Sequence, residues 1–281
     1  MMIGNDIYNR IRINQNIRPE DKPLIYKLFD MSNQISFGKI DSRREGYKFC
    51  GQGYARCTSI TQMDGARAAA LTEWAKREIV SFAKENLVYE LNKVGYLTQE
   101  SINFIMDGAF EYPDKQRDMA AWQGTKAHDN VENWLNTKSF VEDANLELFR
   151  RIWFKEEVEL VATEIPLVWH NKSVGFGGKL DILAYKDGDF IIYDNKTSRS
   201  IHESYALQVA AYKNAVEQMS EGLKIKKCKI IHLADTKDMK EWQIKQYNKL
   251  GHLIEIKHLD KAWSNFKRLL ELYENRNQKY F

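Results

Sequence analysis

The chain has 281 residues, a mass of 33.0 kDa and a formal net charge of +3 at pH 7, with 43% hydrophobic and 29% charged residues. This balance excludes an intrinsically disordered chain and is ordinary for a soluble globular protein with a full core. A pI near 8.5 permits nucleic-acid binding without demonstrating it. Three cysteines, Cys50, Cys57 and Cys228, are too few and too far apart for a disulfide framework or a tetrahedral metal site.

The chain carries no recognisable targeting or membrane segment. Its first residues, Met1–Asp6, do not form a basic segment followed by an apolar run, and nowhere do about eighteen apolar residues follow one another. We therefore expect a cytoplasmic protein with no membrane partner.

Hydrophobic periodicity divides the first two thirds of the chain into helices and then strands. Apolar residues recur at helical spacing from about Gln62 to Lys93 and again from about Ala120 to Thr137, which predicts helices there. Short runs rich in Val, Ile, Leu and Tyr, separated by turn residues, then predict three strands at Glu157–Trp169, Gly178–Tyr185 and Phe190–Asp194.

The last third alternates between the two kinds of element. We expect a helix over about Glu203–Met219, strands near Lys227–Ala234 and Glu241–Gln246, and a final helix over about Leu259–Asn277. This order is typical of an α+β or mixed α/β fold, in which helices flank a sheet.

Acidic residues interrupt or end two of the predicted strands. Asp181 lies inside the apolar run Gly178–Ala184, and a buried carboxylate is normally paired, neutralised or bound to a metal. Asp194 ends the next strand, where alternation places Lys196 on the same side and Asn195 on the other. A hairpin between the strands brings the two aspartates together. Two carboxylates beside a lysine suit phosphodiester hydrolysis with Mg²⁺ or Mn²⁺, because oxygen ligands favour these ions and an ammonium group can position the nucleophile.

Each of these signals also has a purely structural interpretation. An Asp-x-Lys triplet alone can be a surface ion pair at a strand end. Glu164, in another apolar strand, can be solvated at a sheet edge. His128 and Glu132 lie one turn apart on one helix face, where a lone histidine is often structural. Taken alone, Gln208 and Tyr212 are ordinary helix-surface residues.

Together and in this order, these residues resemble the RecB-like exonuclease branch of the PD-(D/E)XK nuclease superfamily. That branch has a helix with Gly-x-x-x-His-x-x-x-Glu, a strand glutamate, a Gly-x-x-Asp strand, an acidic-x-Lys strand and a helix with Gln-x-x-x-Tyr. The resemblance covers about Gln123 to Tyr212. Its elements stand here at Gly124, His128 and Glu132; Glu164; Gly178 and Asp181; Asp194 and Lys196; and Gln208 and Tyr212.

The resemblance implies a role for each site residue. Lys196 would orient and activate the attacking water, and Glu164 would assist through a water molecule. Asn195 departs from the hydrophobic residue usual at its position, but its side chain faces away from the metal. A Mg²⁺ or Mn²⁺ ion would be held by His128, Asp181, Asp194 and the main-chain carbonyl of Asn195. DNA contacts are implied for Gln208, Tyr212, Thr197, Ser198 and Gly124.

The resemblance also implies the architecture. Residues 120–281 would form a restriction-endonuclease-like core, a central mixed sheet flanked by helices, with the mostly helical residues 1–119 packed on it. Members of this branch with an iron–sulfur cluster carry four spaced cysteines, so we expect no cluster here. Tyr54–Ile60 and Trp74 are loosely similar to the segment before the core in compact phage and mitochondrial single-strand exonucleases. On that similarity Trp74 or Trp122 would stack on bases of a threaded strand, and otherwise both pack in the core.

The resemblance favours a metal-dependent DNA exonuclease that prefers single-stranded ends or flaps and acts in replication, repair or recombination, a description that suits a phage-encoded enzyme. Three alternatives stay open. The chain can be a structure-specific or restriction-type endonuclease, a non-catalytic nucleic-acid-binding module on a nuclease fold, or a scaffold unrelated to nucleases.

Overall fold

The chain falls into two compact units, Met1–Met63 together with Ala127–Phe281, and Asp64–Lys126. The structure, a computed structural model, describes residues 12–13, 15–42, 44–63, 65–172, 174–234 and 239–276.

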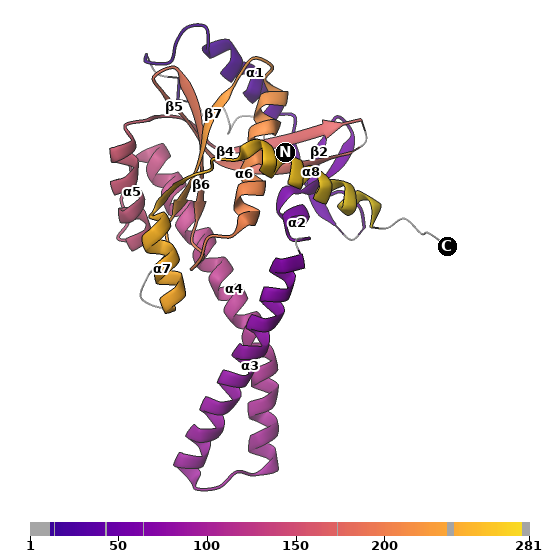
Figure 1. Ribbon diagram of the computed structural model, residues 1–281, viewed down its shortest axis with the longest axis vertical. Coiled ribbons are helices and arrows are strands. Elements are labelled where there is room, and N and C mark those ends of the chain that lie inside the picture. The colour runs from indigo at the N-terminus through magenta and orange to yellow at the C-terminus, as the bar shows by residue number, and fades with distance from the viewer. Residues whose placement is uncertain are drawn as a thin grey trace. The chain divides into compact units, whose positions relative to one another are not determined.

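A mixed sheet forms the centre of the first unit (Figure 1). Among the described residues, eight strands form it in the order β1-β2-β3-β5-β6-β7-β8, and β4 pairs with β5 off this path. The pairs β3–β5 and β6–β7 are parallel and the others are antiparallel. The strands are β1 (Ser36–Lys39), β2 (Glu45–Phe49), β3 (Gln52–Arg56), β4 (Glu159–Asn171), β5 (Val174–Lys186), β6 (Asp189–Lys196), β7 (Ile225–His232) and β8 (Leu253–Glu255).

Helices cover both faces of this sheet, as the opposite positions of α5 and α6 in Figure 1 show. The first hydrophobic core joins the sheet to α1, α2, α6 and α8, and the second joins it to α5 and to the end of α4. The helices of this unit are α1 (Lys22–Ser32), α2 (Cys57–Thr61), α4 (Gln99–Thr137, from Ala127 onward), α5 (Ala144–Glu156), α6 (Glu203–Met219), α7 (Glu241–Leu250) and α8 (Leu259–Asn275). The predicted mixed α/β fold with a helix-flanked sheet is confirmed.

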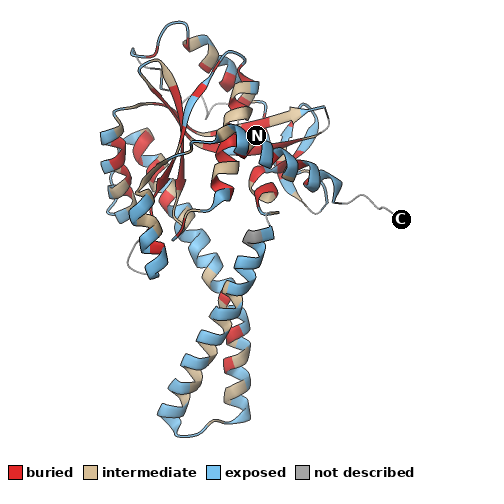
Figure 2. Cartoon of the chain, in the orientation of Figure 1, coloured by how far each residue is buried: buried red, intermediate tan, exposed pale blue. Residues whose placement is uncertain are grey.

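Strand β6 shows why its sequence is apolar at consecutive positions. Phe190 and Ile192 pack in the first core, whereas Ile191 and Tyr193 pack in the second. A strand buried on both faces is hydrophobic throughout, because its side chains alternate between the two faces. Figure 2 shows the central strands β4–β7 as mostly buried. The acidic end of β6 therefore emerges from a strand with no solvent-facing side.

The pairing of β4 with β5 is irregular at the acidic residues. The register pairs Thr163 with Ile182 and Ile165 with Leu180, and it skips Glu164 and the Asp181 opposite it. Glu164 has φ of 54°, in the left-handed region, where a residue other than glycine costs roughly 1–3 kcal/mol and is often found at functional sites. The fold thus holds a strained carboxylate in the middle of its longest strand pair.

The last predicted strand is wrong. Glu241–Gln246 belongs to helix α7, at whose start the main-chain N–H of Lys240 donates a hydrogen bond of 2.8 Å to Gln243 Oε1. Glu241 and Lys245 also form an ion pair of 2.7 Å at the i,i+4 spacing of a helix. These local interactions favour the helix over a strand of only six alternating residues.

Several elements have no counterpart in the sequence prediction. Strands β1–β3 lie inside residues 1–119, which we expected to be mostly helical, and they join the central sheet. Helix α5 and strand β8 were also not predicted. Residue 120, the expected start of the nuclease core, lies within α4.

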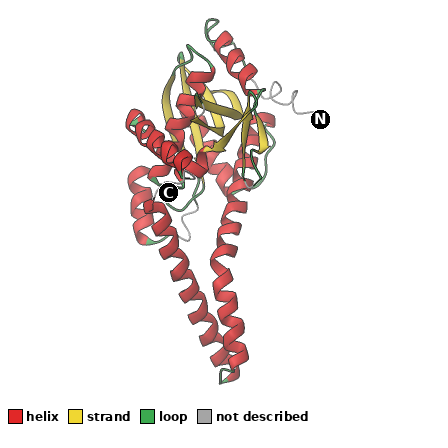
Figure 3. Cartoon of the chain, turned by 90° about the vertical axis from the view of Figure 1, so that its right-hand side faces the viewer, coloured by secondary structure: helices red, strands yellow, loops and turns green. Residues whose placement is uncertain are grey.

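The second unit, Asp64–Lys126, consists of α3 (Gly65–Val94) and the first part of α4, joined by residues 95–98 (Figure 3). The rings of Phe82 and Tyr112 lie 4.7 Å apart between the two helices. Trp122 is 63% exposed, with the Lys126 ammonium 5.4 Å from its ring centroid, whereas Trp74 is half-buried. None of the described helices of the chain is both long and apolar enough to cross a membrane.

Candidate functional site

The hairpin of β5 and β6 brings the two predicted aspartates together. Ile182 pairs with Tyr193, so that Asp181 and Asp194 are the next residues on the two strands. The main-chain N–H of Asn195 donates a hydrogen bond of 2.8 Å to Asp181 Oδ2. This contact fixes the first carboxylate at the end of the strand that carries the second.

Asp194 is fully buried beside a lysine, yet its oxygens are not satisfied. Lys196 Nζ lies 2.6 Å from Asp194 Oδ2, but among the described residues neither carboxylate oxygen accepts a hydrogen bond of good geometry. We interpret the contact as a Coulombic ion pair whose angles are poor for a hydrogen bond, because charge attraction does not depend on those angles. Buried acceptors without donors are costly and rare. A cation beside Asp194 would satisfy them.

A second group of ligand atoms lies next to this pair. One atom each of His128, Glu164 and Asp181 lie within 4.8 Å of one another. His128 Nδ1 is 3.4 Å from Asp181 Oδ2, and the His128 side chain is 29% exposed, so the group reaches solvent. Carboxylate oxygens with one imidazole nitrogen suit Mg²⁺ or Mn²⁺. The residues present therefore fit a divalent cation. The group includes Glu164, which is not among the ligands predicted from the sequence, and two of the predicted ligands, His128 and Asp181; the ligand roles of Asp194 and Asn195 stay predictions.

The pKa shifts of Asp181 and Glu164 also support a cation site. Burial raises the pKa of Asp181, and Asp194 adds to the shift although His128 opposes it. Burial also raises the pKa of Glu164, and Asp181 adds to that shift while the paired Lys179 opposes it. Both carboxylates are thus crowded in a poorly hydrated place, and a divalent cation would relieve this and favour their ionised forms.

Lys196 is held as an ammonium. Burial lowers its pKa, but the attraction of Asp194 and Asp181 outweighs burial, so that the pKa is raised. Its Nζ also lies 5.0 Å from the ring centroid of Tyr205. A lysine that stays protonated can orient a water molecule and neutralise negative charge, but it cannot accept a proton.

Helix α6 packs against strand β5 through Tyr212, which contacts Gly178. Gln208 Nε2 donates a hydrogen bond of 2.9 Å to Tyr212 Oη, and both side chains are buried. A Cβ atom at Gly178 would overlap the Tyr212 ring, so only glycine lets β5 approach the helix this closely. The burial of the pair favours a positioning role over direct contact with DNA, which stays a prediction for both residues.

The remaining predicted contacts lie at the end of β6 and in the other unit. Ser198 Oγ accepts a hydrogen bond of 2.9 Å from Tyr205 Oη and donates one of 2.8 Å to the Ser200 carbonyl. Thr197 is half-buried beside it. Gly124 belongs to the unit Asp64–Lys126. Contacts of Thr197, Ser198 and Gly124 with DNA stay predictions.

Sequence reasoning missed two residues near the carboxylates. Lys179 forms an ion pair with Glu164, and its position two residues before Asp181 in one strand was a signal for it. Cys57, at the start of α2, is buried, and burial raises the pKa of its thiol, with Asp194 adding to the shift. No local signal connects Cys57 to β6, which lies more than a hundred residues later.

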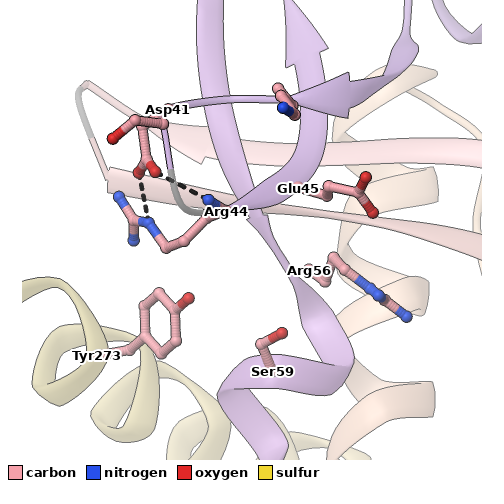
Figure 4. Close-up of a pocket in the computed structure, with 8 residues that line it drawn as sticks. Asp41, Arg44, Glu45, Arg56, Ser59 and Tyr273 are labelled. Carbon is pink, nitrogen blue, oxygen red and sulfur yellow. Dashed lines mark hydrogen bonds and ion pairs between the residues drawn. The ribbon is translucent and has the colours of Figure 1, made fainter.

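A separate cavity lies away from the carboxylate cluster. A cavity of about 470 Å³ opens beside β1–β3 and the end of α8 (Figure 4). It contains none of the predicted site residues. Its lining is Lys39, Asp41, Ser42, Arg44, Glu45, Arg56, Ser59 and Tyr273.

Comparison with known families decides the affiliation. Residues 103–277, more than half of the chain, match the PD-(D/E)XK nuclease superfamily. The chain belongs to this superfamily. The matched range contains every site residue that the sequence predicts, and the eight-stranded mixed sheet agrees with the restriction-endonuclease-like fold. No curated protein matches the chain. Membership confirms the superfamily, a nuclease and a nucleic-acid substrate; the RecB-like branch and the phage or mitochondrial type stay predictions.

Proposed function

We propose that this PD-(D/E)XK chain is a divalent-metal-dependent DNA exonuclease of the RecB-like branch that prefers single-stranded ends or flaps. The observation that carries a metal-dependent reaction is the buried Asp194 carboxylate. Among the described residues no donor makes a well-formed hydrogen bond to it, and it lies next to Lys196 and to the hairpin that carries Asp181 of the cluster with His128 and Glu164. The order of motifs from Gly124 to Tyr212, which resembles that branch, supports the exonuclease assignment. We place the enzyme in DNA replication, repair or recombination in the cytoplasm, or in the host cytoplasm if a phage encodes it.

The metal would be Mg²⁺ or Mn²⁺. When bound, it polarises the phosphate and lowers the pKa of water at the site. We assign its ligands to His128 Nδ1, a carboxylate oxygen each of Asp181 and Asp194, and the main-chain carbonyl of Asn195. The first three come from α4, β5 and β6, and His128 Nδ1 lies 3.4 Å from Asp181 Oδ2.

Two side chains would act on the reacting atoms. The Lys196 ammonium orients the attacking water and offsets the negative charge that grows on the phosphate oxygens. Glu164 accepts the proton of that water at a carboxylate oxygen, because it lies with His128 and Asp181 at the site. Lys179, which pairs with Glu164, keeps this carboxylate turned toward the site.

The test uses three DNA forms and three ion conditions. End-labelled linear single strands, linear duplexes and single-stranded circles are incubated with Mg²⁺, Mn²⁺ or EDTA. Wild type is compared with Lys196→Ala and Asp181→Ala. Lys229→Ala is the matched control, because it also removes a lysine of the same sheet that pairs with a largely buried carboxylate, here that of Glu156 in α5.

We expect metal-dependent loss of linear but not circular DNA, absent from the first two variants and retained in the control. Cutting of circles would instead support the endonuclease. Binding without cutting by folded wild type would support the non-catalytic module.

A further inference from the structure

Strands β1–β3 lie outside the matched range 103–277 but adjoin the site-bearing strand. Arg56, the last residue of β3, is in register with Gly177 of β5. Gly177 precedes Asp181 by four residues, which is roughly 13 Å along an extended strand. A Cβ atom at Gly177 would overlap the side chain of Tyr47, so the sequence has a glycine where this ring crosses β5. The N-terminal strands are therefore packed tightly beside the site.

These strands expose an aromatic and cationic surface, which we call the Phe37 surface and define as Phe37, Tyr47 and Arg56. Phe37 is 54% exposed, and its ring lies edge-on to the ring of its cross-strand partner Tyr47, with centroids 5.2 Å apart. The guanidinium carbon of Arg56 lies 5.8 Å from the Phe37 ring centroid. Partners directly opposite on two strands face the same side of the sheet. The surface thus offers a ring face and a positive charge together.

The Phe37 surface is close to the carboxylate cluster. Lys179, two residues after Gly177 in β5, forms the ion pair with Glu164. Burial raises the pKa of Tyr47 to about 12, and the charge of Arg56 opposes this shift while that of Glu164 adds to it. The Tyr47 side chain, which packs over Gly177, is therefore within electrostatic range of both charged groups.

The charge of Arg56 is available to a ligand. Figure 4 shows Arg44 and Arg56 extending to different sides of the strands, and Arg44 is occupied by its ion pair of 2.5 Å with Asp41. Within the described part of the chain, no carboxylate forms an ion pair with Arg56. Residues 36–56 carry five basic and two acidic side chains, a net charge of +3 that equals the formal net charge of the whole chain. Such a segment attracts phosphates.

We propose that the Phe37 surface binds an unpaired nucleotide of the substrate strand beside the scissile phosphate. The base stacks on Phe37, and Arg56 contacts the adjoining phosphate. Bases inside a duplex hide their faces in the stack, so an exposed ring selects unpaired nucleotides, and stacking tolerates any base sequence. This inference rests on the proposed nuclease function and adds to it the residues that favour a single strand.

The test is equilibrium binding in EDTA, where no cleavage occurs. Fluorescent single-stranded DNA and a blunt duplex of the same length are titrated with wild type, Phe37→Leu and Arg56→Gln. Tyr26→Ala and Lys27→Ala are matched controls, since they remove an exposed aromatic ring and an exposed cation on α1. We expect each Phe37-surface variant to bind the single strand about tenfold more weakly.

Duplex binding tests the preference for a single strand, and the salt dependence distinguishes the phosphate contact of Arg56 from the stacking contact of Phe37. Duplex affinity should change less than twofold in every variant. Arg56→Gln should reduce the slope of log K against log salt by about 0.7, the value for one phosphate contact on a single strand, whereas Phe37→Leu should leave it unchanged. Single-strand affinity within twofold of wild type, or an equal loss for the duplex, would overturn the proposal.

Cleavage by wild type in Mn²⁺ is a separate readout. Weakened single-strand binding without any wild-type cleavage would support the Phe37 surface and refute the nuclease assignment. Wild-type cleavage with unchanged binding by the variants would support the nuclease assignment and refute the role of the Phe37 surface.

Discussion

Strand β6 separates two lysine–carboxylate pairs. They differ in whether the carboxylate oxygens accept well-formed hydrogen bonds from the described residues. On the second-core side, Tyr193 Oη donates a hydrogen bond of 2.5 Å to Glu156 Oε2, and Lys229 forms an ion pair with the same oxygen. On the other side, Lys196 lies against Asp194, whose oxygens accept no well-formed hydrogen bond from the described residues. The first pair is complete within the protein, whereas the second needs another cation.

The pKa values of the acidic groups in the two clusters are shifted in opposite directions. Burial raises the pKa of Glu156, but the hydrogen bonds from Lys229 and Tyr193 outweigh it, so that the pKa is lowered. The pKa of Asp181, in the other cluster, is raised. A lysine beside a buried carboxylate is thus compatible with either a structural or a catalytic role, and the satisfaction of the oxygens distinguishes them.

The largest difference should appear in cleavage. Lys196→Ala should lower the single-turnover rate about 100- to 1000-fold in Mn²⁺, because it removes a charge aimed at the developing negative charge. Lys229→Ala should change that rate less than threefold when measured well below its melting temperature. Equal losses in the two variants would mean that the two pairs do not differ in function.

The structural pair should be seen in stability. Lys229→Ala leaves Glu156 unpaired, and we expect a loss of about 2–4 kcal/mol in the free energy of unfolding, measured with urea. Adding Glu156→Gln to Lys229→Ala should recover part of this loss, because no unpaired charge then remains. An additive double variant would show that the pair is not coupled.

The ionised Asp181 carboxylate should lower the stability of the metal-free protein and bind the metal ion when it is present. The raised pKa of Asp181 means that its ionised form opposes folding above the folded-state pKa when no metal is present. Asp181→Asn, which keeps an acceptor for the Asn195 N–H, should therefore raise Tm in EDTA by roughly 2–4 °C, equivalent to about 1 kcal/mol. Wild type should gain stability with Mn²⁺ and the variant should not. A lower Tm for Asp181→Asn in EDTA would contradict this account.

The smallest effect is a pH dependence of the structural pair. Because the folded pKa of Glu156 is lowered, its stabilisation is fully present above the unfolded pKa, about 4.3, and is lost as the pH falls through the folded pKa. We expect wild type to exceed Glu156→Gln in stability by about 1 kcal/mol or less at pH 7, given solvent screening. This difference should vanish toward pH 3 in thermal melts, and a constant difference would argue against the lowered pKa.

The parts of the fold that sequence predicts are local. Asp181, Asp194 and Lys196 come from one hairpin, so alternation along two adjacent strands is enough to bring them together. The parallel pairing of Arg56 with Gly177 joins segments about 120 residues apart, and no local pattern encodes it. The approach of His128 to Asp181 is equally non-local, and only the resemblance suggested it.

Local sequence patterns also did not predict which helix side chains are buried. Gln208 and Tyr212 have the spacing of helix-surface residues, and only packing against Gly178 shows that they are buried. For residues 241–246 we predicted a strand from a short alternating run. The structure has helix α7 there, which the hydrogen bond from the Lys240 N–H to Gln243 and the ion pair of Glu241 with Lys245 favour.

The most direct test of the central claim is a crystal of the protein soaked in Mn²⁺ and measured for anomalous scattering. The account predicts an anomalous peak at about 2.1 Å from carboxylate oxygens of both Asp181 and Asp194. No peak should lie at Glu156, whose oxygen is already satisfied by Lys229 and Tyr193. A well-ordered crystal with no ion between Asp181 and Asp194, at Mn²⁺ concentrations that support cleavage, would contradict the assignment of this cluster as the metal site.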